Sequence, residues 1–211
     1  MTSTHDIPRP ETLEKSLSHT RDDIEERAVL VVGNGCGVNL ARRVVNAATE
    51  HADRVVFFED RGRHADGDVL PSSSAGNTRA QVVFGSTSEP QSLDAAVLMS
   101  RASLIVVLAD AIETPDNVAA MLRTLAVAAT KHGAWLLLML GETGQLATLA
   151  RHTLGEGIPD WIAFHIDDDT ILQLDATTFL TQRLEAHMPR GKGQALDLNA
   201  LFELLLHLSK T

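Results

Sequence analysis

The stretch Ala28-Val-Leu-Val-Val-Gly-Asn-Gly-Cys-Gly37 joins an apolar run to a glycine cluster, and this junction decides the fold. The apolar part, Ala28 to Val32, predicts a buried parallel strand, and the glycines predict a tight loop directly after it. Apolar residues then recur at helical spacing, with polar residues between them, at Leu40, Ala41, Val44, Val45 and Ala48. A strand, a glycine loop and an amphipathic helix in this order predict the first unit of a Rossmann-type sheet.

The rest of the chain alternates short apolar runs with amphipathic segments. Further strands are expected at residues 54–58, 81–84, 104–109, 135–140 and 161–166. Helices are expected between them, and Gly133 should end the helix that starts after Thr114. Two additional C-terminal helices are expected at residues 170–187 and 196–208. The pattern predicts an α/β fold with a doubly wound parallel sheet of about six strands and right-handed crossovers.

Composition limits the possible partners and the compartment. The formal net charge of −10 and a pI near 5.3 argue against nucleic acid as a partner, because duplex binding requires clustered basic residues. Cys36 is the only cysteine, so no internal disulfide can form and a reducing, cytoplasmic location is expected. The longest apolar stretch, Ala134 to Leu140, is too short to span a membrane, so a membrane link would have to come through a partner.

The glycine loop is the first candidate binding site. Backbone N–H groups of such a loop can approach a phosphate at the N-terminus of the following helix. Gly33 and Gly35 match the first two glycines of the G-x-G-x-x-G motif, whereas Val38 stands at the third position and Gly37 is displaced by one. The predicted cofactor-binding residues of this loop are Gly33, Asn34, Gly35, Cys36 and Gly37. The alternative is a tight turn that binds nothing.

Two acidic residues and two short polar passages follow later strands. Glu59 and Asp60 stand where an acid can accept hydrogen bonds from ribose hydroxyls, Glu59 being in the better register. The alternative is an ordinary solvated strand end, and both interpretations place the two acids in contact with water. Residues expected to flank the nucleotide base follow the next two strands: Gly85, Ser86, Ala109 and Asp110.

One dense cluster of polar residues is a candidate metal-binding site. His165 and the run Asp167, Asp168 and Asp169 carry oxygen and nitrogen ligands, of which the oxygens suit calcium or magnesium. Three consecutive carboxylates cannot all point one way, and one Asp capping a helix near Thr170 accounts for much of the run. We therefore expect no metal. The sequence also contains no G-x-S-x-G, H-E-x-x-H or Walker motif, so no catalytic residue is predicted.

Taken in order, these segments resemble the RCK (TrkA-N) N-terminal domain of potassium channels and transporters. The resemblance is carried by residues 31–35 (VVGNG), 58–60 (FED), 83–93 (VFGSTSEPQSL) and 106–110 (VVLAD). Ser86 replaces the aspartate usual in that family, and Val38 replaces the third glycine. The long segment after the second strand and the C-terminal tail are similar to the CASTOR/POLLUX type. The resemblance implies a ligand such as NAD(H), ATP or ADP, a homodimer or ring, and attachment to a membrane-embedded pore.

These observations predict three regions: a polar N-terminal tail with a short helix (1–27), a nucleotide-binding domain (28–169) and a helical extension of that domain (170–211). The expected function is a nucleotide-binding regulatory subunit of a potassium channel or transporter that is not an enzyme. One alternative is an S-adenosylmethionine-dependent methyltransferase, for which Gly33-x-Gly35-x-Gly37 would be the first motif. Against it stand Gly85-Ser86 where an acid is usual and the lack of an expected terminal antiparallel hairpin. The other alternative is an oligomeric scaffold that binds no ligand.

Overall fold

The computed structural model describes residues 26–34, 38–60, 79–109, 115–140, 145–155, 159–166, 171–187 and 197–209. Its centre is one sheet in which the strands β1 to β7 are arranged in the order β3-β2-β1-β4-β5-β6-β7. Their bounds are Ala28–Asn34, Arg54–Asp60, Arg79–Gly85, Leu104–Ala109, Trp135–Leu140, Trp161–Ile166 and Ile171–Ala176. β1 to β6 pair in parallel, and β7 pairs antiparallel with β6. The predicted α/β, Rossmann-type sheet is confirmed.

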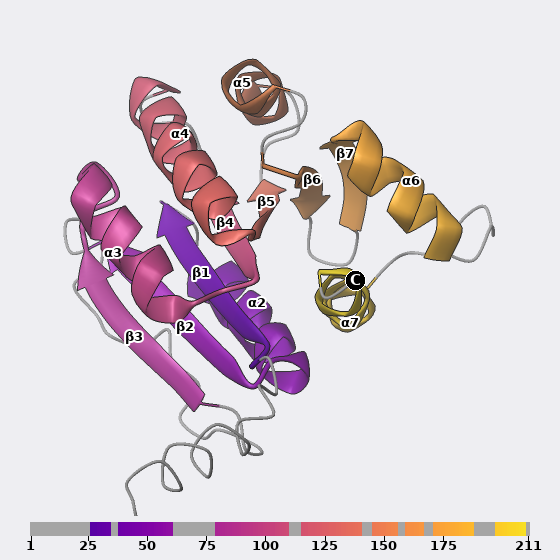
Figure 1. Ribbon diagram of the computed structural model, residues 1–211, viewed down its shortest axis with the longest axis horizontal. Helices are drawn as coiled ribbons and strands as arrows, with labels where there is room; N and C mark the ends of the chain where they lie inside the picture. Colours follow the sequence, from indigo (N-terminus) through magenta and orange to yellow (C-terminus); the bar gives the residue numbers. More distant parts are fainter. Residues whose placement is uncertain are drawn as a thin grey trace, which may run out of the picture.

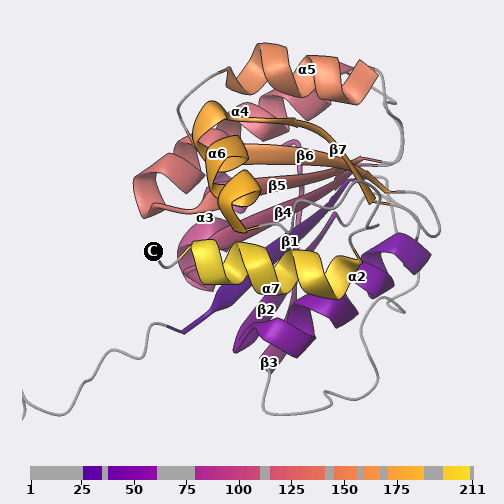
Figure 2. The same cartoon turned by 90° about the vertical axis from the view of Figure 1, so that its right-hand side faces the viewer.

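Helices cover both faces of this sheet (Figures 1 and 2). Their bounds are α2 Val38–His51, α3 Pro90–Ser100, α4 Pro115–His132, α5 Gln145–Leu154, α6 Thr178–His187 and α7 Leu198–Leu208. Side chains of α2, α6 and α7 pack on one face of the sheet, and those of α3, α4 and α5 pack on the other. Each strand therefore sends alternate side chains into two separate apolar layers.

The C-terminal region differs from its prediction in one element. Residues 170–187 were expected to form one helix, whereas the first part is strand β7 and α6 begins at Thr178. Apolar residues at 171, 172 and 174 fit either period, because such a short run does not distinguish helix from strand. The sheet therefore has seven strands, and β6 with β7 forms the antiparallel hairpin that the sequence did not predict. The two C-terminal helices, α6 and α7, are confirmed.

Contacts between elements fix the outer part of the sheet. Arg151 of α5 donates a hydrogen bond from Nε to Asp175 of β7 at 2.6 Å, and this bond and the aspartate charge raise the pKa of the guanidinium. Arg183 of α6 donates to the carbonyl of Leu208 at 3.0 Å, which satisfies the last turn of α7. Gly133 has a φ of 66° and ends α4 as predicted. Within the described part of the chain, no helix is both long and apolar enough to cross a bilayer.

Candidate functional site

The carboxyl ends of the parallel strands gather most of the predicted site positions at one edge. In the strand register, Asn34 pairs with Ala109, Ala109 with Leu140, and Leu140 with His165. On the other side of β1, Asp60 pairs with Gly85. The chain leaves β1 toward β2 on one side and returns to β4 on the other, so the strand order reverses between β1 and β4. Ligands of open α/β sheets bind outside the strand ends at such a point.

Several predicted residues lie outside the described part of the chain. This group contains the centre of the glycine loop, the residue after β4 and the acidic run after β6: Gly35, Cys36, Gly37, Asp110, Asp167, Asp168 and Asp169. Those predictions stay predictions. The described segments do place Gly33 and Asn34 at the end of β1 and start α2 at Val38, so the predicted strand and helix on either side of the glycines are present.

Glu59 is a buried acid at the end of β2. The residue is 4% exposed, which corrects the expectation of an ordinary solvated strand end. Alternation along the strand directs Glu59 to the same face as Phe57, the face that α2 and α7 cover. None of the hydrogen bonds between described residues involves its carboxylate. A carboxylate accepts hydrogen bonds, and ribose hydroxyls are donors of the right kind.

Asp60 points to the opposite face and has a different environment. Its Oδ2 accepts a hydrogen bond from the backbone N–H of Thr87 at 3.1 Å and a shorter one from the Thr87 hydroxyl. Thr87 lies in the turn between β3 and α3 and was not singled out from the sequence. The signal was present in the run Ser86-Thr87-Ser88, because such side chains commonly organise turns through hydrogen bonds.

Gly85 is required at this edge for packing. A Cβ added at Gly85 would lie 2.4 Å from Cζ of Phe58, whose ring is 1% exposed and fixed in the core. Packing against Phe58 therefore explains the glycine at position 85, and the sequence did not reveal this contact. Ser86 follows it, and its Oγ lies 2.7 Å from Oγ of Ser88. Ala109 is 1% exposed within the layer under α3, α4 and α5, so its side chain belongs to the core and not to a ligand surface.

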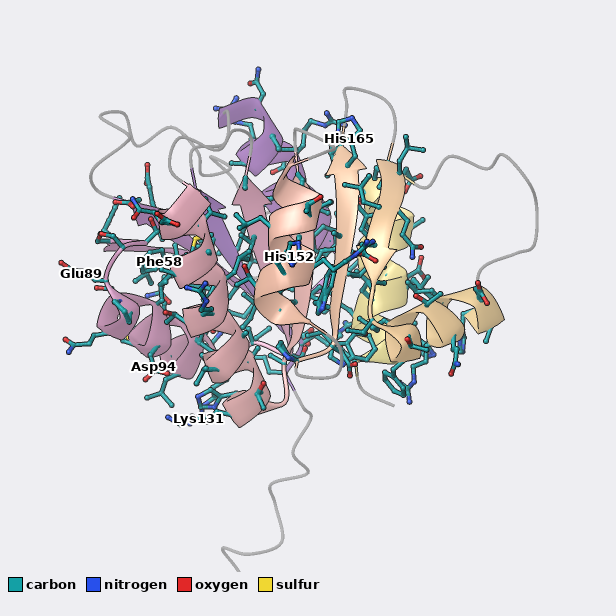
Figure 3. All side chains as sticks on the ribbon, turned by 90° about the horizontal axis from the view of Figure 1, so that it is seen from above. Phe58, Glu89, Asp94, Lys131, His152 and His165 are labelled. Atoms are coloured by element: carbon teal, nitrogen blue, oxygen red, sulfur yellow. The ribbon has the colours of Figure 1, made fainter. Side chains whose placement is uncertain are left out.

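His165 ends the row of strand termini on the side of β6 (Figure 3). Its Nδ1 lies 3.1 Å from the carbonyl oxygen of Leu140. Because a carbonyl only accepts, Nδ1 carries the hydrogen, and Nε2 of the neutral ring is an acceptor. The described residues hold no group of three or more His, Cys, Asp or Glu side chains that could bind a metal, and the acidic run beside His165 lies outside them.

Comparison with known proteins gives a likeness of fold. No protein-family model matches the sequence, and no match was found among curated proteins. Among solved structures, WbmH from Bordetella bronchiseptica in complex with NAD+ is 12% identical over 66% of this chain and 55% of that one, with a TM-score of 0.46. A short-chain dehydrogenase/reductase from Veillonella parvula in complex with NADP is 13% identical over 65% and 68%, also with a TM-score of 0.46.

A third structure, the B. bronchiseptica enzyme WbmG in complex with NAD, is 20% identical over 56% of this chain, with a TM-score of 0.42. The chain covers 39% of WbmG, less than half of its length. At such identities the likeness concerns the fold and assigns no substrate to this chain. All three structures are of enzymes and contradict the expectation that this chain is not an enzyme, while a likeness of fold shows no activity of the chain itself.

Proposed function

We propose that this chain binds NAD(H) at the carboxyl edge of the sheet, beside the ends of β1 and β2. The observation that carries the proposal is Glu59, a buried residue at the end of β2 whose carboxylate has no hydrogen bond to another described residue, on the face that α2 covers. Its oxygens would accept hydrogen bonds from the adenosine ribose. The sequence left open whether the ligand is NAD(H), ATP or ADP. The strand order β3-β2-β1-β4-β5-β6 favours a dinucleotide, because this is the order of dinucleotide-binding sheets.

The start of α2 supplies the electrostatic part of the proposed site. Its first turn contains no acidic residue, so the partial positive charge of the helix N-terminus is not offset there. A pyrophosphate placed at this end would accept backbone hydrogen bonds. Glu59 also favours NAD(H) over NADP(H), because a 2′-phosphate would lie against its negative charge.

The direct test is calorimetric titration with NAD+, NADH, NADPH, ADP, ATP and S-adenosylmethionine, using the native chain and the variant Glu59→Gln. We expect NADH to bind and the variant to lose about tenfold or more in affinity, because a hydrogen bond to a charged group is lost. Glu185→Gln on the exposed side of α6 is the matched control and should bind as the native chain does. Unchanged NADH affinity in Glu59→Gln would remove the basis of the proposal.

S-adenosylmethionine belongs in this panel because of the β6–β7 hairpin. The sequence analysis counted the lack of such a hairpin against a methyltransferase, and the structure contains it. The other objection, that Gly85-Ser86 follows β3 in place of an acid, stands. Saturable binding of S-adenosylmethionine without NADH binding would favour that alternative over the dinucleotide.

The resemblance to RCK domains supports a finer proposal, that NAD(H) binding by a homo-oligomer regulates a membrane-embedded potassium channel or transporter. Its support is the order of the quoted segments along the chain. Removing the gene from its host should change the rate of potassium uptake, and the Glu59→Gln gene should fail to restore it. Uptake that does not respond to removal of the gene contradicts this part of the proposal and leaves NADH binding untouched.

A further inference from the structure

A hydrogen-bonded contact ties the end of β2 to the turn that follows β3. Asp60 Oδ2 accepts from both the backbone N–H and the hydroxyl of Thr87. Thr87 is 9% exposed, and hydrogen bonds to a charged group are stronger where water is largely excluded. One oxygen of the Asp60 carboxylate is therefore already engaged within the protein.

The turn itself, residues 86–89, is held by additional bonds. The backbone N–H of Glu89 donates to the carbonyl of Ser86 at 3.1 Å, and the Ser88 N–H donates to Ser86 Oγ at 3.3 Å. Among the described strands β3 pairs with β2 alone and stands first in the sheet order, so backbone hydrogen bonds from described strands hold it on one side. The bonds from Thr87 to Asp60 add a side-chain connection to the central strands at the end of β3.

Strand alternation separates the two neighbouring acids. Phe57 packs in the layer formed with α2, and Phe58 packs in the layer formed with α3. Glu59 therefore points toward the α2 face, and Asp60 points toward the α3 face, where Thr87 meets it. We therefore expect a ribose bound at the N-terminus of α2 to face Glu59 and not Asp60.

We propose that Asp60 is a positioning residue: through Thr87 it fixes the β3–α3 turn as the surface against which the base of the bound nucleotide lies. Glu59 alone then contacts the ribose. This inference rests on the proposed function of nucleotide binding and divides the two adjacent acids between two parts of the ligand. It also explains why an acid that is already hydrogen-bonded stands beside one that has no hydrogen bond to another described residue.

The experiment compares three ligands: NADH, its 2′-deoxyribose analogue and reduced nicotinamide hypoxanthine dinucleotide, in which the base is changed. Dissociation constants are measured well below the melting temperature of each variant. Thr87→Val removes the hydroxyl at nearly constant volume and should reduce the preference for adenine at least about fivefold, since one hydrogen bond to a charged group is lost. Its preference for the ribose 2′-hydroxyl should stay as in the native chain.

Two further variants complete the design. Thr87→Ser keeps the hydroxyl and should restore the base preference, and Glu59→Gln should show the reverse pattern, with loss of 2′-hydroxyl preference and normal base preference. Asp60→Asn removes the charge and keeps the shape, and it should change the base preference in the same direction as Thr87→Val. It replaces Thr87→Val if that variant does not fold.

Each outcome separates this inference from the proposed function. If Thr87→Val lowers the melting temperature and leaves both preferences unchanged, the contact is only structural and the inference is overturned, while NADH binding stands. If Thr87→Val instead reduces the 2′-hydroxyl preference, the assignment of the two acids is wrong. If the native chain binds none of the three ligands, the proposed function fails and this inference fails with it.

Discussion

The two edges of the sheet differ in the lengths of their connections and in which of them carries the predicted ligand-binding positions. At the amino edge the connections 52–53, 101–103 and 133–134 are short, and main-chain bonds hold them together with side chains such as Asp53 and Arg54. Ser103 N–H donates to the carbonyl of Ala28 at 3.0 Å, and Trp135 N–H donates to that of Ser103 at 3.0 Å. At the carboxyl edge, side chains make the corresponding contacts, as with Asp60 and Thr87. The predicted ligand-binding positions lie at the carboxyl edge, so we expect changes at the amino edge to affect stability alone and changes at the carboxyl edge to affect ligand binding as well.

The largest effect is expected from Trp161→Ala at the amino edge. Trp161 is 2% exposed, packs under α5, and donates from Nε1 to the carbonyl of Gly155 at 2.8 Å. Truncation should lower the free energy of unfolding by about 3–5 kcal/mol through a core cavity. Urea denaturation measures the loss. NADH affinity measured where the variant is still folded should be unchanged, and a matched loss of affinity would contradict the division between the edges.

Gly85→Ala tests the carboxyl edge with a single methyl group. The new Cβ would collide with the Phe58 ring, so stability should fall by about 1–3 kcal/mol through overpacking. NADH affinity should fall as well, because the β3–α3 turn follows Gly85 directly. Gly133→Ala at the amino edge is the control: it meets no atom within 4 Å and costs stability through its positive φ alone, without a change in affinity. The smaller Phe58→Leu should partly rescue Gly85→Ala.

The same division explains which features could be predicted from the sequence. Strands β4, β5 and β6 agree with their predicted bounds, since fully buried strands are continuous apolar runs. The prediction of a helix at the residues of β7 was wrong, because their short mixed pattern of apolar and polar residues fits both the helix and the strand period. The positions of Glu59 and Asp60 at a strand end were predicted. Their different environments were not, because the Asp60 contact joins residues 27 apart in sequence and the burial of Glu59 depends on tertiary packing.

Glu59→Gln should separate function from stability at the carboxyl edge. The amide keeps nearly the same shape without a charge to desolvate, so the free energy of unfolding should rise by about 0.5–2 kcal/mol while NADH affinity falls. Denaturation without ligand and titration with ligand provide the two measurements. Glu185→Gln on exposed α6 should change neither quantity. A less stable Glu59→Gln variant would mean that the carboxylate has a structural role within the folded chain.

The smallest effect is expected from Arg27→Ala, which removes an exposed ion pair at the amino edge. Arg27 Nε lies 3.4 Å from Asp53 Oδ2, and the two side chains are 45% and 44% exposed. Water screens such a pair, so stability should fall by less than about 1 kcal/mol, and the difference should vanish near about 1 M salt. Asp53 also accepts the backbone N–H of Arg27 at 2.8 Å, a bond that the variant retains. A loss above about 2 kcal/mol would show that side chains matter more at this edge than its main-chain bonds indicate.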